Sequence, residues 1–323
     1  MKRRQFIALL GGAAVWPLAA RAQQGGRVRR VGVLAFGAET DRGLLVELKE
    51  LREELKKLGW TQGGDLQLDV RFGGGDFDRT RADAAELVNL APDAIFATSG
   101  AAVDAARQQS KTIPIVATSG DFYERGVVQN VARPEGNVTG FASSFASVGG
   151  RWLELLKEAA PHITRVAYLR RPQAESYGRY IEAAAQNLRV KTETIPVSNA
   201  AEIRAAIERF AAEPNGGLLP NPGIAAIPRQ ELVGLAEQYR LPAIYGAPSL
   251  AADGGLMSYA SDGIENVRGA ASYLDRILRG AKISDLPVQY PTRFRLVINL
   301  KAAKAIGLTI PDSMLLRADQ VIE

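Results

Sequence analysis

The clearest strand–helix–strand unit of this chain reads Ala94-Ile-Phe-Ala-Thr-Ser-Gly-Ala-Ala-Val-Asp-Ala-Ala-Arg-Gln-Gln-Ser-Lys-Thr-Ile-Pro-Ile-Val-Ala-Thr118. Its two ends are short apolar runs, which are typical of strands buried on both faces of a sheet. Small and polar residues over 101–109 predict a helix between them. Pro114 lacks a backbone N–H for a ladder and indicates an edge strand or an early strand position. The unit therefore predicts a parallel sheet with right-handed crossovers.

The same alternation extends in both directions from this unit. Before it, the pattern predicts strands at 31–36 and 66–72 and helices at 44–58 and 80–90. A second series begins near Gly149, with strands at 165–169, 190–197, 217–220, 242–245, 255–259 and 294–298 and helices at 152–160, 175–188, 200–212, 229–239, 262–279 and 301–306. The predicted fold class is α/β, with two Rossmann-like lobes of parallel sheet. Ligands of such sheets bind outside the carboxyl ends of the strands.

The first 22 residues predict an export signal. Residues 1–7 give a cationic start, 8–20 are apolar but too few to span a bilayer comfortably, and Ala20-Arg-Ala22 is a cleavage motif. Arg3-Arg-Gln-Phe-Ile7 matches the twin-arginine pattern, although Lys2 stands where Ser or Thr is usual. We expect cleavage after Ala22 and a soluble mature protein in the periplasm, with the twin-arginine route favoured over the general secretory route.

Most of the net charge of +5 belongs to this signal. The segment holds Lys2, Arg3, Arg4 and Arg21 and no acidic residue, and without them the 40 basic residues become 36, against 35 acidic residues. A nearly neutral mature protein lacks the basic surface that nucleic-acid binding requires, so we expect no nucleic-acid partner. The sequence has no cysteine, which excludes disulfides, thiol catalysis and cysteine-ligated metals.

The sequence offers little for catalysis. His162 is the only histidine and stands in a predicted loop, so a Ser-His-Asp arrangement would depend on it alone. No G-x-S-x-G motif, phosphate-binding loop or histidine cluster at metal-ligand spacing is present. We expect no catalytic residue, no metal site and no cofactor. An exported α/β hydrolase stays open as an alternative, and it requires a nucleophile paired with a base.

Four stretches stand in one order along the chain: Ile113-Pro-Ile-Val116, Arg133-Pro-Glu-Gly-Asn-Val-Thr-Gly140, Gly254-Gly-Leu-Met-Ser-Tyr259, and residues 286–300 running into 301–311. Together they make the chain resemble the ABC transporter substrate-binding protein family, whose characterised members bind aromatic amino acids such as tryptophan. The resemblance implies the periplasmic-binding-protein type I fold, a venus-flytrap receptor that closes around a small organic solute. It also implies delivery of the solute to an ABC permease in the inner membrane, and we expect the mature protein to be a monomer. A receptor of the same fold that senses rather than transports stays open.

The resemblance further implies a hinge with three crossings, near residues 140–142, 259–261 and 288–291. After a signal peptide at 1–22, the N-terminal lobe would comprise 28–141 and 259–289. The C-terminal lobe would comprise 142–258 and 290–323. Loops from both lobes would then line one cleft.

Polar candidates for the cleft follow two strands of the first lobe. Thr98 and Ser99 would offer hydroxyls and backbone N–H groups to a carboxylate at a helix start, or Ser99 would simply cap the helix. Ser119 has the same position on the next strand. Asp121 would hold a ligand amine through a charge-assisted hydrogen bond, or would stabilise its own loop.

Aromatic candidates lie beside them. Phe36 would wall the cleft or complete the core, and Phe122 and Tyr123 would stack on a flat ligand or pack on a neighbouring loop. The family commonly has Asp-Pro-Val where this chain has Asp121-Phe-Tyr123, and Gly where it has Ala260. Both departures lie near the predicted cleft or hinge, so a relative's ligand does not transfer simply to this chain.

From the second lobe, Asn221, Tyr245 and Tyr259 follow or end strands and would present polar tips to a ligand. The alternatives are turn chemistry for Asn221 and core packing for Tyr245. Ser144 and Phe145, just past the first crossing, are weaker candidates.

Overall fold

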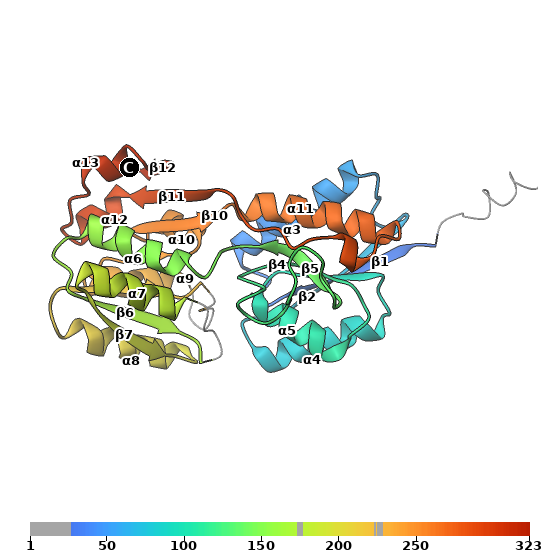
Figure 1. The fold of residues 1–323 in the computed structure, drawn as a ribbon, viewed down its shortest axis with the longest axis horizontal. Coiled ribbons are helices and arrows are strands. Elements are labelled where there is room, and N and C mark those ends of the chain that lie inside the picture. The colour runs from blue at the N-terminus through green and yellow to red at the C-terminus, as the bar shows by residue number, and fades with distance from the viewer. Residues whose placement is uncertain (1–26, 173–176, 223, 225–228) are drawn as a thin grey trace, which may run out of the picture.

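The computed structural model describes residues 27–172, 177–222, 224 and 229–323, and the predicted signal peptide lies outside them. Two lobes stand side by side along the long axis of the molecule, and three segments of chain connect them (Figure 1). Each lobe alternates strands and helices, so the predicted α/β class is confirmed.

The first lobe is built on a parallel sheet in the order β2-β1-β3-β4-β5. Its strands are β1 (Arg29–Ala35), β2 (Leu66–Phe72), β3 (Ala94–Ala97), β4 (Ile115–Ser119) and β5 (Val138–Ala142). Helices α3 (Arg42–Lys57) and α11 (Gly263–Leu278) share one apolar cluster with the sheet, whereas α4 (Phe77–Asn89) and α5 (Gly100–Gln109) share another. The two helix pairs therefore cover opposite faces, and α11 returns to this lobe from late in the sequence.

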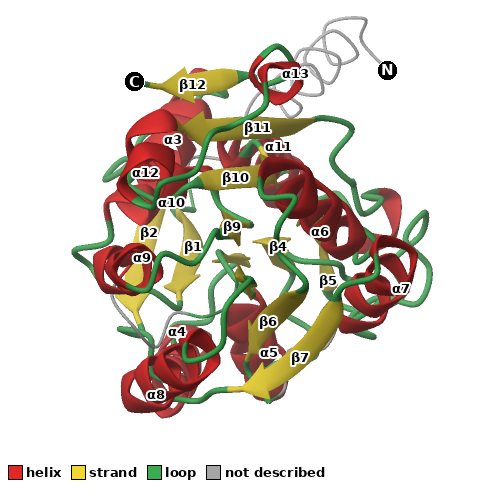
Figure 2. Ribbon diagram, turned by 90° about the vertical axis from the view of Figure 1, so that its left-hand side faces the viewer, coloured by secondary structure: helices red, strands yellow, loops and turns green. Residues whose placement is uncertain are grey.

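The second lobe contains two small sheets. β7 (Lys191–Pro196), β6 (Arg165–Arg170) and β8 (Gly216–Pro220) form a parallel sheet in that order, and β12 (Gln320–Ile322), β11 (Phe294–Asn299), β10 (Met257–Ser261) and β9 (Ile244–Tyr245) form the other. A bridge between Leu218 and Ala243 links them. Its helices are α6 (Val148–Ala159), α7 (Gly178–Leu188), α8 (Ala200–Ala211), α9 (Arg229–Gln238), α10 (Pro248–Ala252), α12 (Leu300–Ala305) and α13 (Asp312–Leu315). The short 3-10 helix η1 (Ile283–Asp285) lies on the chain's excursion to the first lobe. In Figure 2, α6 and α7 lie on one side of these sheets and α8 and α9 on the other.

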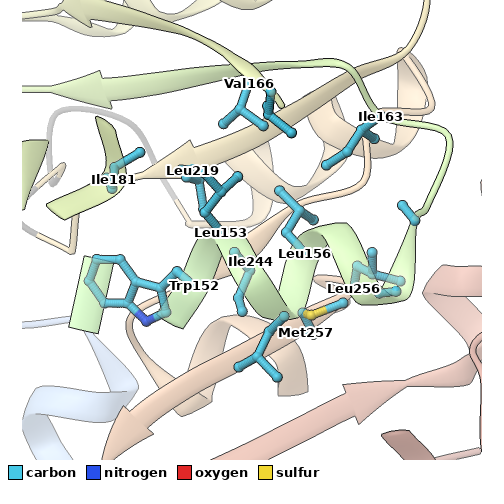
Figure 3. Packing of buried hydrophobic residues seen from close by; sticks show 14 of the residues in the cluster. Trp152, Leu153, Leu156, Ile163, Val166, Ile181, Leu219, Ile244, Leu256 and Met257 are labelled. Carbon is cyan, nitrogen blue, oxygen red and sulfur yellow. The ribbon is translucent and has the colours of Figure 1, made fainter. Parts of the chain in front are cut away.

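Helix α6 carries the core of the second lobe. Trp152, Leu153 and Leu156 project from it toward side chains of four strands, namely Val166, Leu219, Ile244 and Met257 (Figure 3). All seven are buried. The indole Nε1 of Trp152 also donates a hydrogen bond to the carbonyl oxygen of Tyr259, at 2.7 Å. This contact fixes α6 against the middle of β10, three residues before the second crossing.

Three segments cross between the lobes. The first, residues 143–147, joins β5 to α6, and the second, Asp262, joins β10 to α11. The third, residues 290–293, lies between Gln289, which is bridged to Phe141, and β11. The first and second crossings fall just beyond the predicted 140–142 and 259–261, because β5 continues to Ala142 and β10 to Ser261.

Two features of the sheets differ from the sequence-based expectation. β5 is not predicted, because its five residues include Gly140, which has no side chain to continue an apolar pattern. β10 and β11 are antiparallel rather than parallel. The physical reason is the path of the chain: β10 runs out to the first lobe, and β11 returns from it.

Candidate ligand-binding site between the lobes

The lobes meet through segments that follow the carboxyl ends of their strands, and we call this region the interlobe junction. At the start of α9 in the second lobe, Nη2 of Arg229 lies 3.2 Å from Oδ2 of Asp41, the residue that caps α3 in the first lobe. Arg179 of α7 pairs with Glu124, which follows β4. Parallel α/β sheets bind their ligands at these ends, so the junction is the candidate site.

The predicted hydroxyl residues of the first lobe lie at this edge. Ser99 is the N-cap of α5, and its Oγ accepts a hydrogen bond from the Ala102 N–H at 3.2 Å. Its capping role is therefore confirmed. Thr98 beside it is partly exposed, and Ser119 is the last residue of β4. Ligand contact by these three hydroxyls stays a prediction.

Asp121 anchors the hinge. Oδ1 accepts hydrogen bonds from the Tyr123 and Glu124 N–H groups, both at 3.1 Å, and from the Tyr290 hydroxyl at 2.8 Å. Oδ2 accepts one from the Ala146 N–H at 3.1 Å. The carboxylate thus stabilises its own loop, as the alternative for this residue proposed, and it also ties that loop to the first and third crossings. Burial and this hydrogen bond raise the pKa of Tyr290.

The two aromatic residues after Asp121 have opposite environments. Phe122 is fully buried in the core beneath α5 and has no ring face open to a ligand in this conformation, which leaves the predicted stacking role without a surface. Tyr123 is 59% exposed. It lines an open groove of about 610 Å³ beside the crossings, together with Asp121, Tyr290 and Phe145, whose ring stacks on that of Tyr290. Ser144 is buried and shares a hydrogen bond of 2.6 Å with the Tyr177 hydroxyl.

The second-lobe candidates are buried or partly buried, whereas contact with a ligand through their polar tips would require them to be accessible. Tyr245 belongs to the core, as its alternative proposed, and its hydroxyl is buried without a hydrogen-bond partner among the described residues, so burial raises its pKa. Nδ2 of Asn221 donates to the Tyr168 hydroxyl at 2.8 Å. Tyr259 is partly buried and stacks on Phe294. In the described conformation Asn221 and Tyr245 are therefore buried, and Tyr259, the middle residue of β10, is partly exposed.

Phe36 and two residues that sequence patterns do not single out form the far side of the junction. Phe36 is buried against Phe77, with ring centres 4.7 Å apart. The guanidinium of Arg171, which follows β6 in the second lobe, lies over the Phe77 ring. Arg171 stands at the carboxyl end of β6, so the rule that ligands bind at strand ends could have found it.

Glu47 on α3 is a carboxylic acid at the junction whose pKa is raised. Burial raises the pKa of its carboxyl to about 7, the nearby Asp41 carboxylate adds to this effect, and Arg229 opposes it. A Cβ at Gly263 would lie 3.5 Å from Oε1 of Glu47, which places the carboxyl beside the start of α11 and the second crossing.

We predict that this group makes stability depend on pH. Its folded-state pKa of about 7 exceeds the ordinary value of 4.5, so between these limits the folded protein binds more protons than the unfolded chain. The free energy of unfolding should therefore fall as pH rises from about 4.5 to 7, by about 2 kcal/mol for this group. Urea titrations at pH 5 and pH 7.5 measure the difference, and Glu47→Gln should reduce it. An unchanged difference in that variant would contradict the assignment.

The described residues contain no group of three or more His, Asp and Glu side chains arranged to hold a metal ion. His162 is exposed on its loop. No helix in the described ranges is long and apolar enough to cross a membrane.

Comparison with known proteins finds relatives of this architecture. The chain is 24% identical over 262 residues to a tyrosine-binding protein of Clostridioides difficile (strain R20291), covering 79% of this chain and 74% of the relative. A structure of an ABC domain from Streptococcus pneumonia in complex with L-Trp superposes with a TM-score of 0.81 at 23% identity, over 91% of this chain and 99% of that one. A conserved domain protein of Vibrio cholerae gives 0.82 at 25% identity, over 91% and 100%.

The family comparison covers nearly the whole described chain. Residues 31–322 match the model of the ABC transporter substrate binding protein family. The match includes both lobes and all three crossings, so it agrees with the resemblance expected from the four sequence stretches. This protein belongs to the ABC transporter substrate-binding protein family.

Proposed function

We propose that this protein binds a small organic solute between its lobes and delivers it to an ABC permease. The observation that carries the proposal is the interlobe junction, where charged side chains of one lobe pair with those of the other at the carboxyl ends of the strands. A solute that contacts both sets of loops binds the closed arrangement better than the open one, and so shifts the equilibrium toward closure.

We propose further that the solute is an amino acid or an aromatic acid. The relatives named as tyrosine-binding and as a complex with L-Trp support this class. Phe77 and Tyr123 supply exposed aromatic surface at the junction and its neighbouring groove, and aromatic side chains stack well on flat ligands. Because this chain departs from the family's usual residues at Phe122-Tyr123, the exact structure of its ligand does not follow from the ligand of a relative.

The place of action proposed is the periplasm. The cationic start, apolar run and Ala20-Arg-Ala22 motif support export, and Arg3-Arg4 supports the twin-arginine route. The proposed partner is a permease in the inner membrane, with the mature protein acting as a soluble monomer and needing no catalytic step.

A thermal-shift screen of the protein lacking residues 1–22 tests the proposal. Proteinogenic amino acids, aromatic carboxylic acids and sugars would be added one at a time. A solute present at 100 times its dissociation constant should raise the free energy of unfolding by about 2.7 kcal/mol. Arg229→Gln removes the interlobe pair with Asp41 and should weaken binding several-fold. Arg209→Gln, which changes an exposed side chain of α8, should not. Failure of every solute class to stabilise the protein would contradict the proposal.

A further inference from the structure

Arg171 joins the two lobes without an ion pair among the described residues. It follows β6 of the second lobe, and its guanidinium carbon lies 3.9 Å from the ring centre of Phe77 and 5.6 Å from that of Phe36, both in the first lobe. The two rings touch each other at an interplanar angle of 45°. The aromatic pair therefore fixes the face of the cation at the junction.

Arg171 is partly exposed as a residue, but two of the three guanidinium nitrogens are covered and make no hydrogen bond. Nε and Nη1 of Arg171 are buried and have no hydrogen-bond partner among the described residues. A ring stacked on the face of a guanidinium leaves the N–H groups pointing outward in the plane, so the contacts with Phe36 and Phe77 do not satisfy them. Burial without a partner also lowers the pKa of Arg171. Buried charged groups are normally paired, because an unpaired one is costly.

Other arginines near the strand ends show the usual arrangement. Nη1 of Arg229 donates to Ser249 Oγ at 2.8 Å, in addition to the pair with Asp41. Arg179 pairs with Glu124, and Nη2 of Arg125 donates to Asp104 at 2.6 Å. Each of these cations has a protein carboxylate, whereas no carboxylate in the described part of the chain pairs with Arg171. The difference indicates that an acceptor for Arg171 comes from outside the chain.

We propose that Arg171 recognises the carboxylate of the solute, which accepts hydrogen bonds from its guanidinium at the interlobe junction. The inference rests on the proposed function, whose amino acids and aromatic acids all carry a carboxylate, and assigns the recognition of that group to this residue. One unpaired cation balances one negative charge on the solute. Asp41 also lies close by, since its Oδ2 would be 3.5 Å from a Cβ at Gly37, the residue after Phe36. Its negative charge disfavours a more highly charged anion. Guanidinium–carboxylate hydrogen bonds are among the strongest that proteins make.

The anion would bind Arg171 of the second lobe while this side chain is stacked on rings of the first lobe. Binding of the anion therefore also favours closure of the two lobes. In the open arrangement Arg171 loses Phe36 and Phe77 and its donors reach water. In the closed arrangement they need the carboxylate. The closed arrangement would thus be stable only when the bound solute carries a carboxylate.

The test compares acids with their neutral amides. Isothermal titration calorimetry would use benzoate and benzamide, phenylacetate and phenylacetamide, and L-tyrosine and L-tyrosinamide. We expect the wild-type protein to bind at least one acid about tenfold or more tightly than its amide. Arg171→Gln should lose that preference and keep the amide affinity, whereas the charge-matched control Arg209→Gln, on the same lobe and exposed, should behave as the wild type.

A ligand-free measurement supports the same test. Arg171→Met keeps the stacked side chain but removes the unpaired charge, so its melting temperature without solute should equal or exceed that of the wild type. Equal affinity for acid and amide, or unchanged acid affinity in Arg171→Gln, overturns the inference and leaves the proposed function standing. If no solute of any class binds, the proposed function fails. In that case the melting temperature of Arg171→Met still tests the inference: a fall overturns it, and a rise supports the unpaired state of Arg171.

Discussion

Replacing Gly140 with alanine is expected to lower the free energy of unfolding by about 4 kcal/mol or more. Gly140 lies in β5 with φ of +141°, a conformation that residues with a side chain rarely adopt. A Cβ there would lie 2.1 Å from the carbonyl oxygen of Ala117 and 2.6 Å from its nitrogen, both in the neighbouring strand β4. Because both obstacles are backbone atoms in a sheet, the clash cannot be relieved by a side-chain rotation.

The substitution also acts on the hinge. The carbonyl oxygen of Gly140 accepts a hydrogen bond from the Gln289 N–H at 2.9 Å, next to the third crossing. A shift of β5 would therefore displace this crossing. Urea denaturation and soluble yield measure the effect. Gly234→Ala is the matched control: Gly234 lies exposed within α9, and a Cβ there would have no neighbour within 4 Å, so alanine should stabilise by about 0.5–1 kcal/mol. A loss below about 1 kcal/mol at Gly140 would contradict the argument.

Much of the fold follows from local patterns. Short apolar runs identify buried strands, and the prediction from Pro114 holds because this residue immediately precedes β4, which is an inner strand, so its missing N–H interrupts no ladder. The patterns fail where geometry depends on distant chain. β5 depends on Gly140 fitting against Ala117, and the reversal of β11 depends on the chain's detour through the first lobe. Neither appears in a window of neighbouring residues.

The candidate site is also predicted only in part from the sequence. The rule that ligands bind at strand ends selects the loops of the junction, since Ser99, Asp121 and Phe36 all lie at the junction edge of the first lobe. It does not say which side chains of a loop remain accessible. Phe122 is buried and Tyr123 exposed because Asp121 binds the backbone of that loop and fixes its turn. The contact of Arg171 with Phe77 joins residues of different lobes, so no pattern within one lobe predicts it.

Replacing Asp121 with alanine is expected to lower the free energy of unfolding by about 3 to 5 kcal/mol and to weaken solute binding. Four donors lose their acceptor at once: the N–H groups of Tyr123, Glu124 and Ala146 and the hydroxyl of Tyr290. Asp121 is only 5% exposed, so water does not easily replace the carboxylate. The loss should be smaller than the sum of four charged hydrogen bonds, because the exposed Tyr123 segment can turn toward solvent.

Two further variants separate the parts of this anchor. Tyr290→Phe removes the hydrogen bond to Asp121 and the long one, of 3.4 Å, that the hydroxyl accepts from the Tyr123 N–H. It should cost about 1 kcal/mol, with little change in the β4–β5 loop. Asp121→Asn keeps the shape but replaces one acceptor oxygen by a donor, so either the Ala146 bond or the Oδ1 bonds must be lost. If the anchor sets the hinge, X-ray scattering should show a larger radius of gyration for Asp121→Ala than for Tyr290→Phe. If instead Asp121 acts chiefly on a ligand amine, Asp121→Ala should lose affinity for amines with nearly wild-type stability. The measured balance between stability and affinity decides between the two roles, because a carboxylate committed to four protein donors has little capacity left for a fifth.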